Sequence, residues 1–137
     1  MLEIKKFAAI DIGSNAIRLL ISNVIISEDR DPQFKKSSLV RVPIRLGADA
    51  FVSDGVISAA NVTRMIHAME AFKLLMNVHG VERYRACATS AMREASNGME
   101  VKAQVLSQTG IKIDVISGKE EAAIISSTDL NLESAAT

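Results

Sequence analysis

The strongest constraint on the fold is an apolar run that ends in a cluster of turn-forming residues and then resumes. Residues 8–12 read Ala-Ala-Ile-Asp-Ile, Gly13, Ser14 and Asn15 follow, and residues 17–21 read Ile-Arg-Leu-Leu-Ile. Because Gly, Ser and Asn favour tight bends, we predict two strands joined by a short polar turn. Glycine tolerates a positive φ angle and a close approach to its backbone, and we expect both at Gly13.

The turn and the residue just before it carry groups that bind phosphate and metal ions. Ser14 and Asn15 offer hydrogen-bond donors, and concave arrays of backbone N–H groups hold anions such as phosphate. Asp11 places a carboxylate where it could hold Mg²⁺, directly or through water. The segment also fits an ordinary hairpin with polar turn residues, so alone it does not separate a binding turn from a structural one.

Hydrophobic periodicity predicts three successive strands, followed by alternating helices and strands. Ser58 suits the N-cap of the first helix and Gly80 its stop, while Asn97 and Glu100 have the spacing of a capping box for the second. The expected elements are strands at 7–12, 17–26 and 36–46, a helix at 58–80, a strand at 83–88, a helix at 97–110, a strand at 111–115 and a helix at 117–126. This β-β-β-α-β-α-β-α order indicates an α/β domain that opens with an antiparallel meander.

The amino-acid composition limits the cellular compartment and the classes of binding partner that fit this chain. The chain carries 16 basic and 16 acidic residues, and this balance argues against nucleic-acid binding, which leaves a basic footprint. Cys87 is the single cysteine, which excludes an intrachain disulfide and fits a reducing cytoplasm. We interpret it as a small buried strand residue rather than a nucleophile. Since no apolar run approaches the length of a membrane span, we expect no membrane insertion and a cytoplasmic location.

Two further segments, together with the opening turn, carry a family resemblance. Residues 87–97 read Cys-Ala-Thr-Ser-Ala-Met-Arg-Glu-Ala-Ser-Asn, and residues 113–122 read Ile-Asp-Val-Ile-Ser-Gly-Lys-Glu-Glu-Ala. In this order and spacing the three motifs resemble the exopolyphosphatase and guanosine pentaphosphate phosphohydrolase family, from about Phe7 to Ile125. That family belongs to the actin-like ATPase superfamily, so the resemblance implies half of an actin-like ATPase module, a ribonuclease-H-like mixed sheet with helices.

Each motif follows a predicted strand, at the edge of an α/β sheet where ligands collect. The Arg93 guanidinium is suited to clamp two phosphate oxygens, because its planar fork stays charged at physiological pH. A surface salt bridge of Arg93 with Glu94 or Glu120 is the structural alternative, and the family resemblance favours the clamp. The resemblance therefore implies phosphate binding by Gly13, Ser14, Asn15 and Arg93.

Two adjacent carboxylates follow the third motif, and helix geometry separates them. If Ser117 caps the last helix, Glu120 stands at the third helical position, where it can bond back to the cap and complement the helix dipole. Glu121 has no such structural explanation and points about 100° further round the helix. Glu121 also matches the family's catalytic glutamate, which implies the base that activates water.

The resemblance implies a phosphoanhydride hydrolase that releases terminal phosphate from inorganic polyphosphate or guanosine penta- or tetraphosphate, with Mg²⁺ as cofactor. The family's second phosphate turn, Asp-x-Gly-Gly-Gly-Ser, is absent from this sequence. We therefore expect residues 1–126 to form the amino-terminal domain and 127–137 a tail toward a missing second domain, without which the chain is inactive. A kinase or ATPase of the same superfamily and a non-catalytic alarmone- or polyphosphate-binding regulator are the alternatives. The sequence leaves open whether the chain forms a homodimer.

Overall fold

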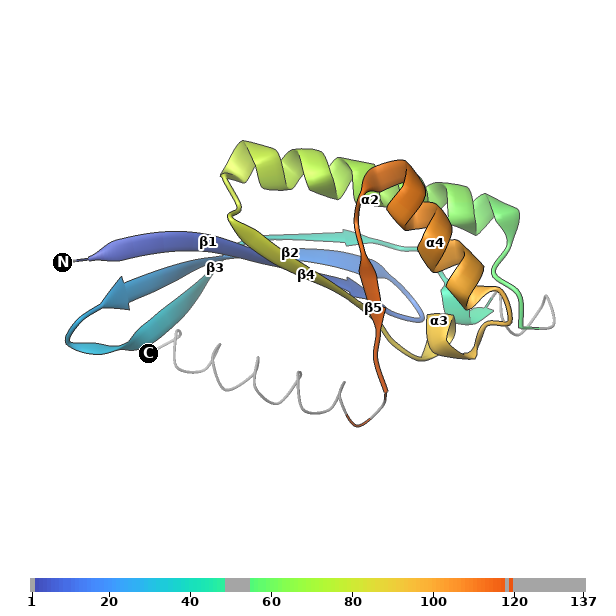
Figure 1. Ribbon diagram of the computed structural model, residues 1–137, viewed down its shortest axis with the longest axis horizontal. Coiled ribbons are helices and arrows are strands. Elements are labelled where there is room, and N and C mark those ends of the chain that lie inside the picture. The colour runs from blue at the N-terminus through green and yellow to red at the C-terminus, as the bar shows by residue number, and fades with distance from the viewer. Residues whose placement is uncertain (1, 49–54, 118, 120–137) are drawn as a thin grey trace.

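The computed structural model describes residues 2–48, 55–117 and 119. Within them the chain forms one mixed five-stranded sheet with the order β3-β2-β1-β4-β5 (Figure 1). The strands are β1 (Glu3–Ile12), β2 (Ile17–Ser27), β3 (Arg30–Val42), β4 (Arg83–Ala88) and β5 (Ile113–Val115). The expected α/β class with a mixed sheet is confirmed.

The sheet combines an antiparallel meander with parallel additions. β1 pairs with β2 and β2 with β3 in antiparallel fashion, as predicted, whereas β4 lies parallel to β1 and β5 parallel to β4. In this register Ile12 is the partner of Ala88, and Ala88 of Val115. The carboxyl ends of the three parallel strands therefore meet at one edge, which is where ligands bind in open α/β sheets.

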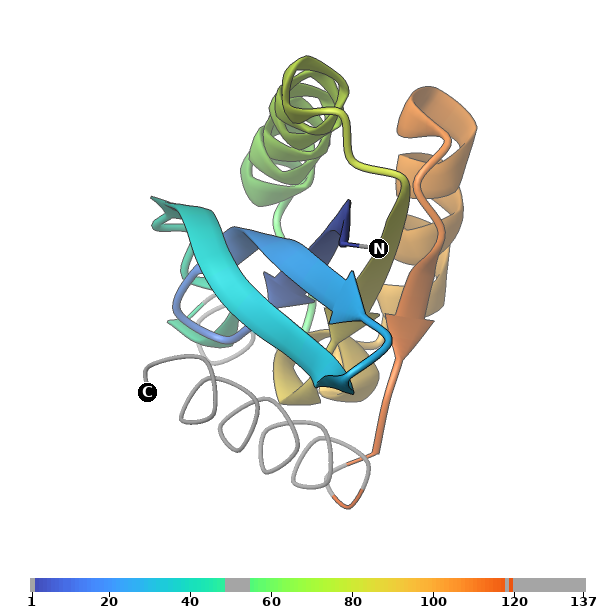
Figure 2. The same ribbon diagram turned by 90° about the vertical axis from the view of Figure 1, so that its left-hand side faces the viewer.

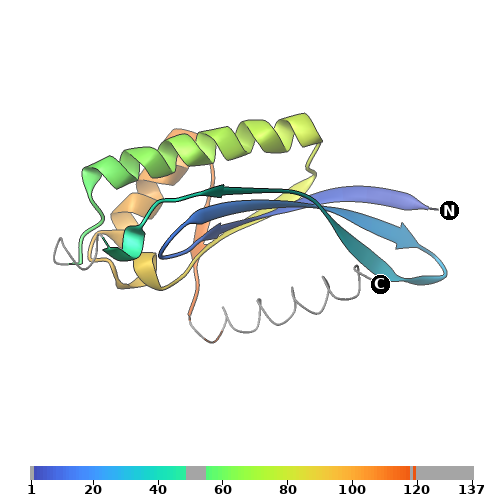
Figure 3. The same cartoon turned by 180° about the vertical axis from the view of Figure 1, so that it is seen from behind.

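Two long helices pack on one face of the sheet, α2 (Ala59–His79) and α4 (Gly98–Thr109), and a short one, α3 (Ser90–Glu94), follows β4 (Figures 1 and 3). The predicted limits of α2 are confirmed. The Ser58 hydroxyl accepts a hydrogen bond from the N–H of Asn61, and Gly80 ends the helix in the left-handed conformation at φ 72°. Such a conformation favours glycine because it has no Cβ.

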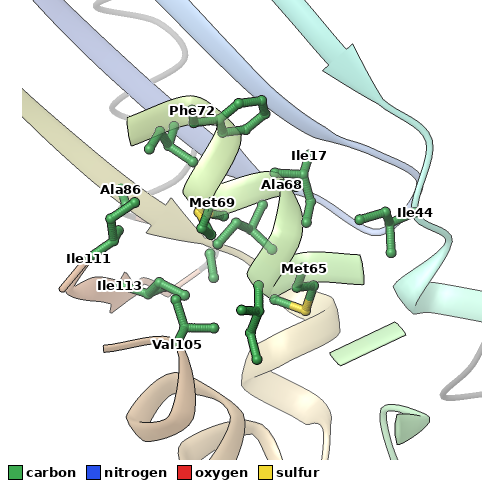
Figure 4. Packing of buried hydrophobic residues seen from close by; sticks show 14 of the residues in the cluster. Ile17, Ile44, Met65, Ala68, Met69, Phe72, Ala86, Val105, Ile111 and Ile113 are labelled. Atoms are coloured by element: carbon green, nitrogen blue, oxygen red, sulfur yellow. The ribbon is translucent and has the colours of Figure 1, made fainter. Parts of the chain in front are cut away.

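The core lies between these helices and the sheet, and it is almost entirely aliphatic. Phe72, Met65 and Met69 of α2 are fully buried and face the helix side of β1 and β2 (Figure 4). Val105 of α4 and Ile113 of β5 close the other end of the same cluster. Burying a side chain of this size contributes about 1.5–3 kcal/mol, so the meander and the helices form one cooperative unit.

Strand limits differ from expectation where pairing with β2 extends a neighbouring strand. β3 was predicted at 36–46 but runs from Arg30 to Val42, because the hairpin reverses at Glu28–Asp29 and Arg30 already pairs with Ser27. β1 likewise begins at Glu3 rather than Phe7, where it continues to pair with β2. Ile44 and Leu46 are buried, yet they lie beyond the end of β3.

The predicted capping box at Asn97 is wrong. The Asn97 side chain accepts a hydrogen bond from the N–H of Ile57 at 2.9 Å and donates one to the Ile57 carbonyl at 3.0 Å, and it caps no N–H of α4. It therefore fastens the segment before α2 to the start of α4. Figure 2 shows α2 and α4 side by side on the same face of the sheet.

The order of elements also differs. The described elements read β-β-β-α-β-α-α-β, because α3 was not predicted. The helix expected from Ser117 to Ser126 lies almost wholly outside the described residues. No helix in the described part of the chain is both long and apolar enough to cross a bilayer.

Candidate functional site

The turn between β1 and β2 is compact and closed by its own backbone. The N–H of Gly13 donates to the carbonyl of Ala16 at 3.0 Å. The expected positive φ at Gly13 is wrong, since the glycines with positive φ in the described residues are Gly55, Gly80 and Gly110. A glycine is favoured at position 13 because space is short: a Cβ there would lie 3.3 Å from the Ala16 carbonyl oxygen.

Two neighbouring segments hold the turn in place. The carbonyl of Ser14 accepts a hydrogen bond from the N–H of Gly47 at 2.9 Å, and its hydroxyl lies 3.3 Å from the hydroxyl of Ser90, the first residue of α3. The backbone N–H groups of Ser14 and Asn15 form no hydrogen bond with any described residue. The turn is thus rigidly held, and both N–H groups remain available to an acceptor.

A hollow of about 240 Å³ opens at this turn. It is lined by Asp11, the turn residues 13–16, Arg18 and Arg41. The guanidinium of Arg18 forms an ion pair with the carboxylate of Asp11, through Nη2 and Oδ2. The two residues are direct cross-strand partners, and their side chains are 53% and 40% exposed, so the pair borders solvent.

Arg93 lies at the same edge of the sheet but does not line this hollow. Its Nη1 donates to the carbonyl of Ile116, just beyond β5, at 2.7 Å. The N–H of Thr89 donates to the carbonyl of Ile12 at 3.2 Å, and the N–H of Ile116 donates to that of Ala88 at 3.0 Å. These contacts join the ends of β1, β4 and β5, so the described parts of the three motifs are contiguous in space.

The remaining predictions concern Glu120 and Glu121, and an ion pair between Arg93 and Glu94. Glu121, the expected base, and Glu120, a possible partner of Arg93, lie outside the described residues, so their roles stay predictions. Arg93 forms no ion pair with Glu94, the other partner considered from the sequence. Its guanidinium has five N–H donors, and among the described residues only the Ile116 carbonyl accepts from it, through one of them.

Arg41, Gly47 and Ser90 contribute to the site and were missed by the sequence analysis. Arg41 comes from an edge strand, and only the register that makes it the partner of Arg18 brings it to the turn. Gly47 approaches so closely that a Cβ would lie 3.1 Å from the Cβ of Ser14. The Arg-Leu-Gly sequence at 45–47 was the one available signal, but Arg45 itself is exposed and does not line the hollow.

Among the described residues, no group of three His, Cys, Asp or Glu side chains could enclose a metal ion. Asp11 is the single carboxylate at the hollow, and its Oδ1 has no hydrogen bond to a described residue. This fits the way proteins bind Mg²⁺, through one or two carboxylates, several waters and substrate phosphates.

Cys87 stands between Asp11 and Asp114 in the sheet register, with Arg85 forming an ion pair to Asp114 at 3.5 Å. Burial raises the pKa of the Cys87 thiol above its ordinary value; the Arg85 guanidinium opposes this shift, and the two carboxylates add to it. Because the thiolate is the nucleophile, a raised pKa lowers reactivity at neutral pH. Cys87 is a strand residue as expected but half-buried rather than buried, and its raised pKa agrees with a structural rather than nucleophilic role.

We therefore expect the native chain to be alkylated by iodoacetamide with a pH midpoint above that of the same chain unfolded in urea. Mass spectrometry of the alkylated fraction across a pH series measures both midpoints. A native midpoint equal to or below the unfolded one would show that Cys87 is an activated thiol.

Comparison with known proteins identifies first the fold and then the family. The chain matches the crystal structure of a Ppx/GppA protein from Aquifex aeolicus with a TM-score of 0.77 and 28% identity, over 87% of this chain and 37% of that one. An exopolyphosphatase from Cytophaga hutchinsonii matches with a TM-score of 0.75 and 26% identity, over 87% and 36%. The fold is therefore of the actin-like ATPase type.

The family follows from the sequence. Residues 25–128 match the model of the Ppx/GppA phosphatase family, and the chain belongs to this family. It is 27% identical over 117 residues to exopolyphosphatase 1 of Mycobacterium tuberculosis, covering 85% of this chain and 33% of that protein. It is 30% identical over 119 residues to guanosine-5'-triphosphate,3'-diphosphate pyrophosphatase of Vibrio cholerae, covering 87% and 23%. The chain thus spans a third or less of these curated relatives.

Proposed function

We propose that this chain is the amino-terminal domain of a hydrolase that releases terminal phosphate from inorganic polyphosphate or guanosine pentaphosphate. The observation that carries the proposal is the hollow at the end of β1, which is lined by Arg18, Arg41 and two turn residues whose backbone N–H groups bond to no described residue. Membership of the Ppx/GppA phosphatase family supports the same chemistry.

In this proposal the described residues bind and orient the terminal phosphoryl group. The N–H groups of Ser14 and Asn15 hold its oxygens, and Gly13 provides room for the approach rather than a donor, because its own N–H is bound to Ala16. Arg93 supplies further donors from the end of α3. Fixed donors of this kind stabilise the charge that develops during phosphoryl transfer.

Glu121 is the proposed base, orienting and deprotonating a water for in-line attack on the terminal phosphoryl group. Asp11 is the proposed Mg²⁺ ligand, directly or through water; the ion would neutralise charge on the phosphate oxygens. The ion pair with Arg18 holds the Asp11 carboxylate in place.

Because the chain covers 33% of the Mycobacterium tuberculosis exopolyphosphatase 1 and 23% of the Vibrio cholerae pyrophosphatase, we propose that a second domain completes the cleft and that this chain alone hydrolyses nothing measurable. Phosphate release from polyphosphate and guanosine pentaphosphate, assayed on the pure 137-residue chain, tests this part. Robust release would contradict it, and ATP-dependent phosphorylation of a sugar would favour a kinase.

Phosphate binding by the described site is tested with the variant Arg93→Gln. We expect the folded chain to bind tripolyphosphate in calorimetry and the variant to bind about tenfold more weakly, since a charge-assisted hydrogen bond is lost. Arg83→Gln is the matched control, because Arg83 is an exposed arginine at the opposite end of β4. Equal affinities of the two variants would remove Arg93 from the site, and no binding by the parent chain would reject the phosphate site.

A further inference from the structure

Arg41 reaches the hollow through the register of the sheet. Arg41 is the cross-strand partner of Arg18, and Arg18 is the partner of Asp11, so the three form one row across β3, β2 and β1. Val40 and Val42, which flank Arg41 in the chain, pack against the core, and strand side chains alternate between the two faces of a sheet. The row therefore lies on the sheet face opposite α2 and α4.

Arg41 is the cation in this row whose charge is not matched within the site. Arg18 is neutralised by its ion pair with Asp11, whereas the Arg41 side chain forms no ion pair or hydrogen bond with any described residue. The described side chains lining the hollow thus hold one carboxylate and two guanidinium groups, a formal excess of one positive charge. An anion entering the hollow would meet this charge beside the free N–H groups of the turn.

The order of the strands sets the direction in which a bound phosphate chain can run across the sheet. Arg93 and its partner Ile116, just beyond β5, lie on one side of β1, and Arg41 lies on the other side, on the edge strand β3. The hollow of about 240 Å³ has room for several oxygen-sized groups, since one water occupies about 30 Å³ in the liquid. A phosphate chain whose terminal unit lies near Arg93 can therefore extend over β2 toward β3.

From this arrangement we propose that Arg41 binds a non-terminal phosphoryl unit of the substrate, the part that leaves when the terminal bond is cleaved. The inference rests on the proposed function, because the direction of the substrate is set by the terminal phosphoryl unit at Arg93. Arg41 is then a specificity residue that favours chains of phosphate over a single phosphate ion. Its planar, permanently charged fork suits bidentate contact with phosphate oxygens.

The test compares two ligands on the isotope-labelled chain by nuclear magnetic resonance, following the amide signals of Ser14 and Asn15. Inorganic tripolyphosphate and orthophosphate are titrated separately at one constant ionic strength, because screening changes every charge contact. We expect Arg41→Gln to weaken tripolyphosphate binding about tenfold and to change orthophosphate binding by less than about twofold. Arg41→Lys, which keeps the charge but loses the fork, should fall between parent and Arg41→Gln.

Arg30→Gln is the matched control. Arg30 is an exposed arginine of the same strand, eleven positions before Arg41 and so roughly 35 Å from it. Equal tripolyphosphate affinities of Arg30→Gln and Arg41→Gln would overturn the inference while leaving the phosphate site intact. Equal weakening of both ligands by Arg41→Gln would also overturn it, since Arg41 would then serve the terminal unit. If neither phosphate ligand shifts the Ser14 and Asn15 amide signals of the parent chain, the proposed function itself is rejected.

Discussion

Replacing Glu121 by Gln is expected to lower turnover of polyphosphate by about 10²–10⁴-fold, the usual contribution of a positioned general base. The amide has nearly the shape of the carboxylate but cannot accept the proton of the attacking water. Binding should be retained, because the N–H groups of Ser14 and Asn15 and the guanidinium of Arg93 do not depend on residue 121. The measurement is kcat and KM for phosphate release by the chain joined to the second domain proposed above, with a change in kcat and little change in KM.

Glu120→Gln is the matched control for Glu121→Gln, because it makes the same chemical change one residue earlier. At the third position of a helix capped by Ser117, Glu120 would stabilise the helix start, and its loss should cost stability of about 1 kcal/mol rather than turnover. Unchanged turnover in Glu121→Gln would reject the catalytic assignment. A larger kinetic loss in Glu120→Gln would mean that the other carboxylate is the base.

The elements predicted most closely are those fixed by local signals. α2 has a serine cap, a glycine stop and apolar residues at helical spacing, and β4 was predicted with its observed limits. The helix α3 was missed because it has five residues, too few to show a helical period. β3 was misplaced because it begins with Arg30, Asp31 and Pro32, where Asp and Pro favour turns, and only pairing with β2 makes this segment a strand.

The same contrast between local signals and contacts set by the fold applies to the site residues. Because each motif follows a strand, the sequence predicted a common edge, and the contacts from Thr89 to Ile12 and from Arg93 to Ile116 place the described motif residues there. Arg41 could not be found in this way, since its approach depends on cross-strand register. Asn97 was read as a local cap, whereas its amide bonds to Ile57, which lies forty residues earlier.

A methyl group at position 98 should strongly destabilise the fold, although glycine is a poor helix former. A Cβ on Gly98, the first residue of α4, would lie 2.1 Å from the carbonyl oxygen of Met92. That oxygen belongs to the backbone of α3 and cannot move without displacing Arg93. We expect Gly98→Ala to lower the free energy of unfolding by about 3 kcal/mol, at the upper end of overpacking effects. Urea denaturation followed by circular dichroism measures this loss.

The sign of the effect separates the steric cause from helix propensity. Without a clash, alanine in a helix is more favourable than glycine by up to about 1 kcal/mol, so Gly98→Ala should then stabilise. Gln108→Ala is the control, because Gln108 is an exposed residue of the same helix and its replacement should change stability by no more than about 0.5 kcal/mol. If the displaced Met92 carbonyl carries Arg93 with it, Gly98→Ala should also weaken tripolyphosphate binding while Gln108→Ala does not. Undiminished stability of Gly98→Ala would show that α3 and α4 separate freely, and the position of Arg93 would then not depend on their contact.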